Sequence, residues 1–364
     1  MSRVTSEARF DLPDAEKHIL ALSEIVKFHD AEVTLVDGRY HAKMSFGEAR
    51  WWAQNDVVTL HAEAPDLASL NGIKMELTSN LSVLSKRELG AKWSGEVREP
   101  TLIPTFRLLT VLSKSALTPH MTRIVFSGEN LLRFAKNSNL HMRLAFPRSR
   151  EIAPHWPMVD ADGRLVWPEG AQRPILRKYT IRHIDAVAGT VAVDFVLHDD
   201  AGPGARFAAD ARAGDIVGMI GPGGLTAGSA DWYLLAGDET ALPAIARILE
   251  TRSDTARGVA VIEVADASEE QTIDNKSGIE LRWLHRNGAA PGTTTLLTDA
   301  VRAVPFPTGD ASVFAWAGCE FESFKSIRSY LRTARGLKKD EYLVVSYWRR
   351  GTTIDEMEQA LREE

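Results

Sequence analysis

The residues with the most evident chemistry in this sequence form the short run Arg177-Lys178-Tyr179-Thr180-Ile181-Arg182. The run predicts a β-strand, and strand alternation would place Arg177, Tyr179 and Ile181 on one face and the other three residues on the opposite face. A flavin needs an aromatic face against its ring system, hydroxyl groups near its ring nitrogens and cations near its diphosphate. Tyr179, Thr180 and the two arginines supply these groups. A half-exposed strand whose charges face water is the alternative.

A glycine-rich turn follows at His198, Gly202 and Gly204, and it leads through Ala205 towards Phe207. This pattern predicts a turn that enters a short helix. The free N–H groups and the positive dipole end of such a helix suit a diphosphate. A pair of ordinary turns between strands is the other interpretation.

A third group of polar residues, Asp238-Glu239-Thr240, comes directly after a short apolar strand at 232–237 and opens a predicted helix. Parallel strands alternating with helices seat nucleotides at the carboxyl ends of the strands. No G-x-G-x-x-G follows the strand, so the sequence does not choose between NADH and NADPH.

Positioning these groups requires several domains, because 364 residues exceed what one hydrophobic core usually serves. We expect a small α+β domain at 1–98, an antiparallel β-barrel that binds FAD at 99–228, and an α/β domain that resembles NAD(P)-binding domains at 229–364. In the first domain, a helix at 13–28, a hairpin at 32–46, a strand at 57–62 and a helix from 66 to about 89 are predicted.

The barrel is predicted from short β-runs separated by Gly, Pro, Asn and Asp. The runs are Phe106–Leu112, Met121–Phe126, His141–Phe146, Arg164–Trp167, Arg177–Ile184, Val191–Leu197 and Asp215–Ile220. In the last domain, strands are predicted at 232–237, 258–264, 280–284, 312–316 and 342–347, with a helix at 321–335.

Composition restricts the function. A net charge of −6 and a pI near 6.0 give no reason to expect nucleic-acid binding. The single cysteine, Cys319, excludes an intramolecular disulfide and any cysteine-based iron–sulfur or zinc site. No apolar run is long enough for a membrane span, so we expect a cytoplasmic protein. His29, His41 and His61 lack the spacing of metal ligands, and no metal site is expected.

Five motifs in one order resemble the siderophore-interacting protein family, which comprises FAD-containing ferric-siderophore reductases of the ferredoxin–NADP reductase superfamily. The resemblance covers roughly residues 102–355. The motifs are Arg177–Arg182, His198, Gly202-Pro203, Gly237–Ile245 with Trp316–Glu320, and Tyr347-Trp348-Arg349-Arg350-Gly351. The first domain is similar to a small domain of unassigned function found ahead of such proteins.

The resemblance implies that Arg177, Tyr179 and Thr180 hold the FAD ring and phosphates, and that His198 and the turn at Gly202 contact the rest of the cofactor. The sequence departs from the family at two places. The hydroxyl that members usually offer to the diphosphate is missing at Ala205, so backbone N–H groups would have to replace it. Cys319 stands before Glu320, where members usually have glycine.

The implied reaction is reduction of a ferric siderophore by electrons from NADH, NADPH or ferredoxin, with release of Fe(II). Ferric catecholates are anionic, so basic residues are candidates for binding them. Arg349 and Arg350 are the better candidates. Lys325 and Arg328, with Arg332, Arg335 and Lys339, form a stripe that a solvated helix face explains more simply. A general flavin or ferredoxin-type reductase and a non-enzymatic iron-chelate binder remain as alternatives.

Overall fold

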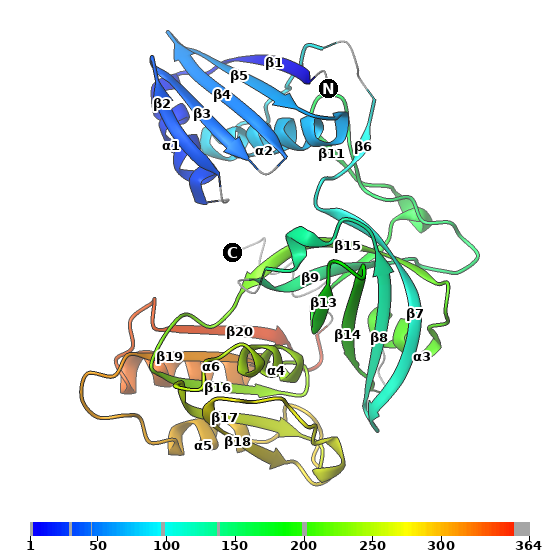
Figure 1. The fold of residues 1–364 in the computed structure, drawn as a ribbon, viewed down its shortest axis with the longest axis vertical. Coiled ribbons are helices and arrows are strands. Elements are labelled where there is room, and N and C mark those ends of the chain that lie inside the picture. Colours follow the sequence, from blue (N-terminus) through cyan, green and yellow to red (C-terminus); the bar gives the residue numbers. More distant parts are fainter. Residues whose placement is uncertain are drawn as a thin grey trace. The chain divides into compact units, whose positions relative to one another are not determined.

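The computed structural model describes residues 3–28, 31–44, 46–95, 99–136, 139–198 and 202–352. The chain forms two compact units, one comprising Met1–Phe106 and Pro147–Pro174 and the other comprising Arg107–Phe146 and Ile175–Glu364 (Figure 1). The chain therefore passes between the units three times. The first unit contains a segment that interrupts the predicted barrel sequence.

An antiparallel sheet with two helices on one face makes up most of the first unit (Figure 1). Its strands lie in the order β1-β5-β4-β3-β2. The elements are β1 Val4–Asp11, α1 Ala15–Phe28, β2 Glu32–Val36, β3 Arg39–Met44, β4 Gly47–Gln54, β5 Val57–Ala64 and α2 Leu67–Ser85. The buried side chains of Trp51, Leu60 and Ile73 form the core between the sheet and the helices. The predicted helices and hairpin are present, whereas β1 and β4 were not predicted.

Helix α2 is shorter than the sequence pattern suggested. Its first turn is capped by Asp66, whose side chain accepts a hydrogen bond from Ser69 N at 2.8 Å. The helix ends at Ser85 because Lys86 adopts the left-handed conformation, with φ 52°, and its N–H bonds to the carbonyls of Ser82 and Val83. The apolar residues up to Leu89 therefore do not extend the helix.

A second, three-stranded sheet completes the first unit, in the order β11-β10-β6. It consists of β6 Thr101–Leu102, β10 Met158–Val159 and β11 Leu165–Val166. The prediction that 164–167 forms a barrel strand is wrong, because this run pairs with β10 and not with the barrel. A two-residue strand carries too few side chains for its alternation to indicate which sheet it joins.

The barrel of the second unit has the strand order β12-β9-β15-β7-β8-β14-β13. Its elements are β7 Phe106–Thr118, β8 Met121–Gly128, β9 Asn139–Phe146, β12 Ile175–Thr180, β13 His183–Asp185, β14 Thr190–Val196, α3 Pro203–Asp210 and β15 Ile216–Leu225. The predicted run 177–184 is broken after Thr180. Ile181 and Arg182 connect β12 to β13, the two outermost strands of the sheet. In this connection, Ile181 N bonds to Leu140 O of β9, and Arg182 N bonds to Ala192 O of β14.

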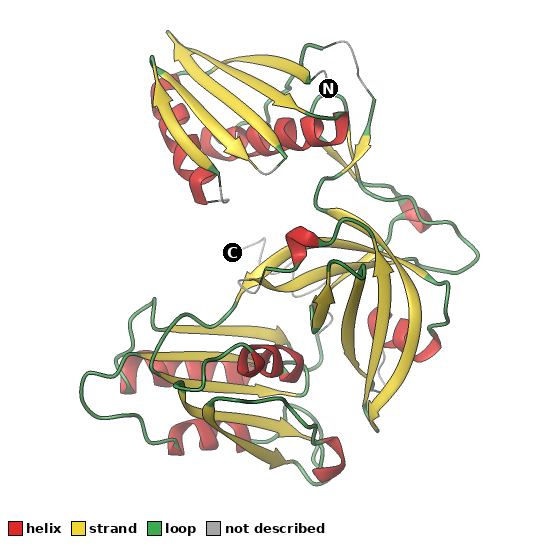
Figure 2. Ribbon diagram, in the orientation of Figure 1, coloured by secondary structure: helices red, strands yellow, loops and turns green. Residues whose placement is uncertain are grey.

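The C-terminal part is a parallel sheet in the order β18-β17-β16-β19-β20, with helices on both faces (Figure 2). Its elements are β16 Trp232–Asp238, α4 Leu242–Glu250, β17 Arg257–Val264, β18 Gly278–His285, α5 Leu296–Ala303, β19 Val313–Glu320, α6 Phe321–Ser329 and β20 Tyr342–Trp348. Helix α5 was not predicted. The predicted helix 321–335 is α6 followed by a π-helical turn, Tyr330–Ala334.

Helix α4 covers one face of the parallel sheet, and α5 and α6 cover the other. The core under α4 also contains Met121 and Leu140 from the barrel. Barrel and parallel sheet thus share buried apolar surface along α4. Among the described residues, no helix is long and apolar enough to cross a membrane.

Candidate cofactor and substrate site

Tyr179 lies on β12 and packs into an aromatic cluster of the barrel. Its ring centroid is 4.5 Å from that of Phe195 and 6.0 Å from that of Phe146. Burial raises the pKa of the Tyr179 phenol, so the hydroxyl stays protonated at neutral pH. The neighbouring Thr180 and Ile181 are both buried. Ile181 and Tyr179 belong to the same core cluster of the barrel, as the predicted alternation requires, although the strand itself ends at Thr180.

Helix α3 begins beside Tyr179. A β-carbon on Gly204 would lie 1.9 Å from Tyr179 Oη, so only a glycine permits this approach. The N-cap residue, Gly202, provides no side-chain cap for the N–H groups of the first turn. At the other end of the helix, Lys114 Nζ donates to the carbonyls of Ala208 and Ala209, at 3.2 and 2.7 Å. The helix is thus stabilised at its negative end.

The groups present here fit an FAD. Within the described residues, the hydroxyls of Tyr179 and Thr180 make no hydrogen bond, although Thr180 is only 6% exposed. Neither hydroxyl oxygen is among the fully buried atoms that lack a partner, so both remain accessible to a ligand or water. A β-carbon on Gly202 or Gly223 would meet no atom within 4 Å, so both glycines border open space. Aromatic surface, hydroxyls and an uncapped helix N-terminus therefore occur together.

The other predicted cofactor residues of the barrel are Arg177, His198 and Ala205. Arg177 is on β12 and donates from Nη1 to Leu176 O at 2.7 Å. His198 is exposed, and it precedes residues 199–201 of the predicted turn, which lie outside the described residues. Ala205 is buried in the first turn of α3, where a larger side chain would have to displace its neighbours.

Arg182 connects the barrel with helix α4. Its guanidinium bonds to both carboxylate oxygens of Glu250, at 2.5 and 2.7 Å. It also lies 3.7 Å from Asp194, which holds Arg123 at 2.6 and 2.8 Å. Arg182 is thus engaged by carboxylates, and this geometry favours a role in joining the two domains.

Arg247, one turn before Glu250 on α4, is a second link between the domains. Its side chain is 6% exposed and donates to the carbonyls of Asn139 and Ile181, both at 3.0 Å, and of Lys136 at 3.3 Å. These carbonyls lie at the start of β9 and just past the end of β12. Helix α4 therefore holds the backbone on both sides of the Tyr179 strand.

A third link joins His141 of β9 to Tyr347 of β20, with Nε2 and Oη 2.6 Å apart. His141 is paired across the strands with Thr180. Burial, with the nearby cations of Lys178 and Arg247, lowers the pKa of His141 to about 4. The imidazole is therefore neutral at pH 7, and the protonated phenol can donate to it.

Tyr347 and its neighbour Trp348 carry the link on to the carboxyl edge of the parallel sheet. Trp348 Nε1 donates to Asp238 Oδ2 at 2.9 Å, and Glu320 N donates to the same oxygen at 3.1 Å. Burial, and next the Glu239 carboxylate, raise the pKa of Asp238 to about 6. Thr240 donates to the other oxygen, from N at 2.9 Å. Asp238 and Thr240 are thus hydrogen-bonded parts of this edge.

Glu239, the remaining predicted residue at this edge, forms a bidentate pair with Arg286, at 2.8 Å for both bonds. Arg286 is buried, and it also lies 3.5 Å from Glu263. The prediction that Thr240 begins a helix is wrong, because α4 begins at Leu242 after Ala241. The edge is therefore acidic, and its carboxylates are bonded to other groups of the protein.

The predicted substrate cations gather around two rings of α6. Arg349 and Lys325 both lie over Phe321, at 4.7 and 5.1 Å from its centroid, and Arg328 lies over Phe324 at 5.7 Å. Arg350 is exposed, and its N–H bonds to Glu320 Oε1 at 3.2 Å. Of the predicted stripe, Arg335 lies over Phe306 at 3.9 Å, and Lys339 lies beyond the helix.

Sequence reasoning missed His141 and Arg247 as site residues. The signal for Arg247 was available, because it is the only charged residue in the interior of the apolar helix α4. An isolated cation in an apolar segment indicates a buried partner. His141 gave no comparable signal, since a histidine on a strand is commonly part of a polar face.

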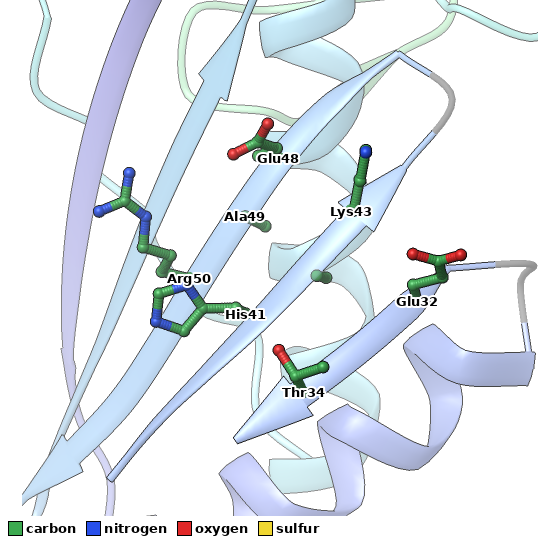
Figure 3. Close-up of a pocket in the computed structure, with 8 residues that line it drawn as sticks. Glu32, Thr34, His41, Lys43, Glu48, Ala49 and Arg50 are labelled. Atoms are coloured by element: carbon green, nitrogen blue, oxygen red, sulfur yellow. The ribbon is translucent and has the colours of Figure 1, made fainter. Parts of the chain in front are cut away.

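A separate depression lies on the open face of the first unit's sheet, with a volume of about 250 Å³ (Figure 3). Figure 3 shows its polar side chains projecting from β2, β3 and β4. They are Glu32, Thr34, His41, Lys43, Glu48 and Arg50. Glu48 pairs with Arg3 at 3.0 Å and Arg50 with Glu63 at 3.2 Å, so much of this charge is balanced within the sheet. Across the described residues, no cluster of His, Cys, Asp and Glu could hold a metal; His29 lies outside them.

Comparison with known proteins identifies relatives over most of the second unit. A family model for the siderophore-interacting FAD-binding domain matches residues 110–226, and one for the siderophore-interacting protein matches residues 230–351. The ferric vibriobactin reductase ViuB of Vibrio cholerae is 33% identical over 250 residues, which cover 67% of this chain and 90% of that protein.

Solved structures agree with these matches. A siderophore utilization protein from T. fusca is 41% identical, with a TM-score of 0.63, and the match covers 72% of this chain and all of that one. The siderophore-interacting protein SipS from Aeromonas hydrophila is 29% identical, with a TM-score of 0.59, and the match covers 74% of this chain and 98% of that one.

Proposed function

The chain belongs to the siderophore-interacting protein family, and from this premise we propose that it is an FAD-dependent reductase that releases iron from ferric siderophores. The observation that carries the proposal is the match of the FAD-binding domain to residues 110–226, which contain both β12 and α3. The partnerless hydroxyls of Tyr179 and Thr180 and the uncapped start of α3 support it.

FAD, when bound, supplies a carrier that takes two electrons as a hydride and gives them up one at a time. Tyr179 and Thr180 would orient its ring system against β12. The first-turn N–H groups of α3, with Arg177 and His198, would hold the diphosphate. Because residue 205 is an alanine, the backbone N–H groups have to supply what a hydroxyl supplies in other members of the family.

The substrate would approach the cations around Phe321. Ferric complexes of hard oxygen chelators are commonly anionic, and Lys325, Arg328, Arg349 and Arg350 offer positive charge in an exposed position. Such chelators bind Fe(II) much more weakly than Fe(III), so reduction is enough to loosen the metal. The protein needs no general acid or nucleophile for this reaction.

A pyridine nucleotide is the electron donor that we propose, because the α/β domain has the architecture that seats nucleotides at the carboxyl edge of its strands. Ferredoxin is the second candidate. Asp238, Glu263 and Glu320 at the carboxyl edge are buried and bonded within the protein. Experiment has to decide between NADH and NADPH.

Initial rates of Fe(II) formation test this function. The purified protein with FAD should reduce ferric siderophores when NADH or NADPH is present, with Fe(II) trapped by a chromogenic chelator. Turnover of free flavin or ferredoxin without any turnover of ferric chelates would instead indicate a general flavin or ferredoxin-type reductase. A colourless protein that ignores added FAD would indicate a non-enzymatic chelate binder.

A further inference from the structure

The segment 147–174 lies between the two strands that carry His141 and Tyr179, yet it is part of the first unit. Strand β9 ends at Phe146 and β12 begins at Ile175, and these two residues are paired across the strands. The two ends of the segment are also tied together. Arg148 Nε donates to Arg173 O at 3.0 Å, and His155 N to Gln172 O at 3.2 Å. The segment is thus a long folded loop between neighbouring strands.

The tip of this loop packs on helix α2 of the N-terminal domain. Lys74 of α2 is 2% exposed, and its Nζ donates to Ala161 O at 3.3 Å. Asp162 Oδ1 accepts a hydrogen bond from Trp93 N at 3.2 Å. A β-carbon on Gly163, where φ is +77°, would lie 2.8 Å from Lys74 Cβ. Helix and loop tip are therefore in direct contact, and the buried ammonium donates to a carbonyl of the loop.

The face of α2 that makes this contact is polar and buried, which is unusual for a helix on a sheet. Asn71, Lys74 and Thr78 follow one another at helical spacing. Asn71 Nδ2 donates to Glu99 O at 3.0 Å, and Trp93 Nε1 donates to Thr78 Oγ1 at 3.2 Å. The opposite, apolar face of α2 packs on the sheet. One face of the helix thus packs on the sheet of its own domain. The other face contacts the tip of the loop and the segment that follows the helix, at Trp93 and Glu99.

We propose that the N-terminal domain is an intramolecular clamp: by holding the tip of the 147–174 loop, it fixes the ends of β9 and β12 and so the position of the flavin-binding strand. The proposal deepens the function proposed above and rests on it for the cofactor. It gives the N-terminal domain a role in cofactor retention. Buried polar contacts suit such a role because each one has a specific partner.

Hydrogen exchange of the full-length apoprotein tests the clamp without any flavin. In Lys74→Met, which keeps the side-chain length but removes the ammonium, we expect exchange at 156–167 and at 175–182 to accelerate about tenfold, since a buried hydrogen bond from a charged group is lost. Asp162→Asn, a milder change on the loop side, should act in the same direction. Lys27→Met, on the exposed surface of α1, is the matched control and should change neither segment.

Faster exchange at 156–167 with unchanged exchange at 175–182 would overturn the proposal, and so would unchanged exchange at both. The affinity for FAD, measured by flavin fluorescence, should fall in Lys74→Met and Asp162→Asn but not in Lys27→Met. Loosened β12 with undiminished FAD affinity would refute the role in cofactor retention. If the wild-type protein binds no FAD, the proposed function fails, while the exchange data still decide whether the clamp exists.

Discussion

Gly204 lies directly against the hydroxyl of Tyr179: a β-carbon built on the glycine would lie 1.9 Å from Oη and 2.9 Å from Cζ. The contact joins the two segments that we propose to hold FAD, the strand β12 and the start of helix α3. Because no side chain separates them, the first-turn N–H groups of α3 and the phenol lie on one continuous surface.

Gly204→Ala should weaken FAD binding by about tenfold, because overpacking a close contact costs ~1–3 kcal/mol. Tyr179→Phe, which removes a hydroxyl that we propose to contact the flavin, should also weaken binding. Flavin fluorescence titration measures both. Gly90→Ala, at an exposed glycine where a β-carbon meets no atom within 4 Å, is the control. Equal affinity of Gly204→Ala and wild type would contradict the placement of FAD.

The hydrogen bond between His141 and Tyr347 should stabilise the second unit. Tyr347→Phe removes only the hydroxyl and should lower the free energy of unfolding by about 1 kcal/mol, the usual net value of such a bond. In a double-mutant cycle with His141→Asn, measured by urea unfolding, the two changes should be coupled. Strictly additive effects would show that the bond contributes nothing.

His141 should also make the protein less stable in acid. Its pKa is lowered to about 4 in the folded protein, whereas an unfolded histidine titrates near ~6.5. Between these values the unfolded state binds the proton and the folded state does not, so stability falls as pH falls from ~6.5 to about 4. His141→Asn should remove up to ~3 kcal/mol of this loss. Parallel stability curves for variant and wild type over that range would contradict the burial of a neutral imidazole.

Arg247→Met should loosen the contact between barrel and parallel sheet. Three backbone carbonyls would lose their donor, and unsatisfied buried acceptors cost ~1–3 kcal/mol each. We expect a drop of at least about 2 kcal/mol in the free energy of unfolding. Circular dichroism during urea unfolding measures it. Arg257→Met, at an exposed arginine of β17, is the control. A variant as stable as wild type would mean that solvent replaces the guanidinium.

Lys325→Ala and Arg349→Ala should raise KM for an anionic ferric siderophore several-fold, about fivefold each, since each removes one exposed charge worth ~1 kcal/mol at close range. The kcat value should change little, and added salt should shrink the difference. Arg332→Ala, on the π-helical turn after α6, is the matched control, because no ring contact or ion pair involves Arg332 within the described chain. A lowered kcat with unchanged KM would contradict a role in substrate capture.

The sequence predicted individual strands and helices better than the contacts between distant segments. The hairpin at 32–46 and most barrel strands follow from alternation and turn residues, which act locally. Strand β1 escaped prediction because its buried positions include Ser6, which does not read as apolar. The run 177–184 was predicted as one strand because nothing local shows that β12 ends at Thr180.

The sequence offers candidates where a single segment supplies the chemistry, and it gives no sign of contacts where distant segments meet. Tyr179 and Thr180 are proposed from their residue types alone, and their roles stay predictions. The bond between His141 and Tyr347 joins residues 206 positions apart, and that between Arg247 and Asn139 joins residues 108 apart. Such contacts depend on how the barrel packs on helix α4, which no local pattern encodes. The sequence likewise does not show that Arg182, predicted as a phosphate ligand, pairs with Glu250, 68 positions further on.

A crystal structure of the protein grown with excess FAD tests the central claim most directly. We predict that the isoalloxazine lies against β12 within reach of the Tyr179 and Thr180 hydroxyls, with the diphosphate at the first turn of α3 beside Gly202. A bound FAD located elsewhere, or these hydroxyls satisfied by the protein's own side chains with no cofactor present, would contradict the account.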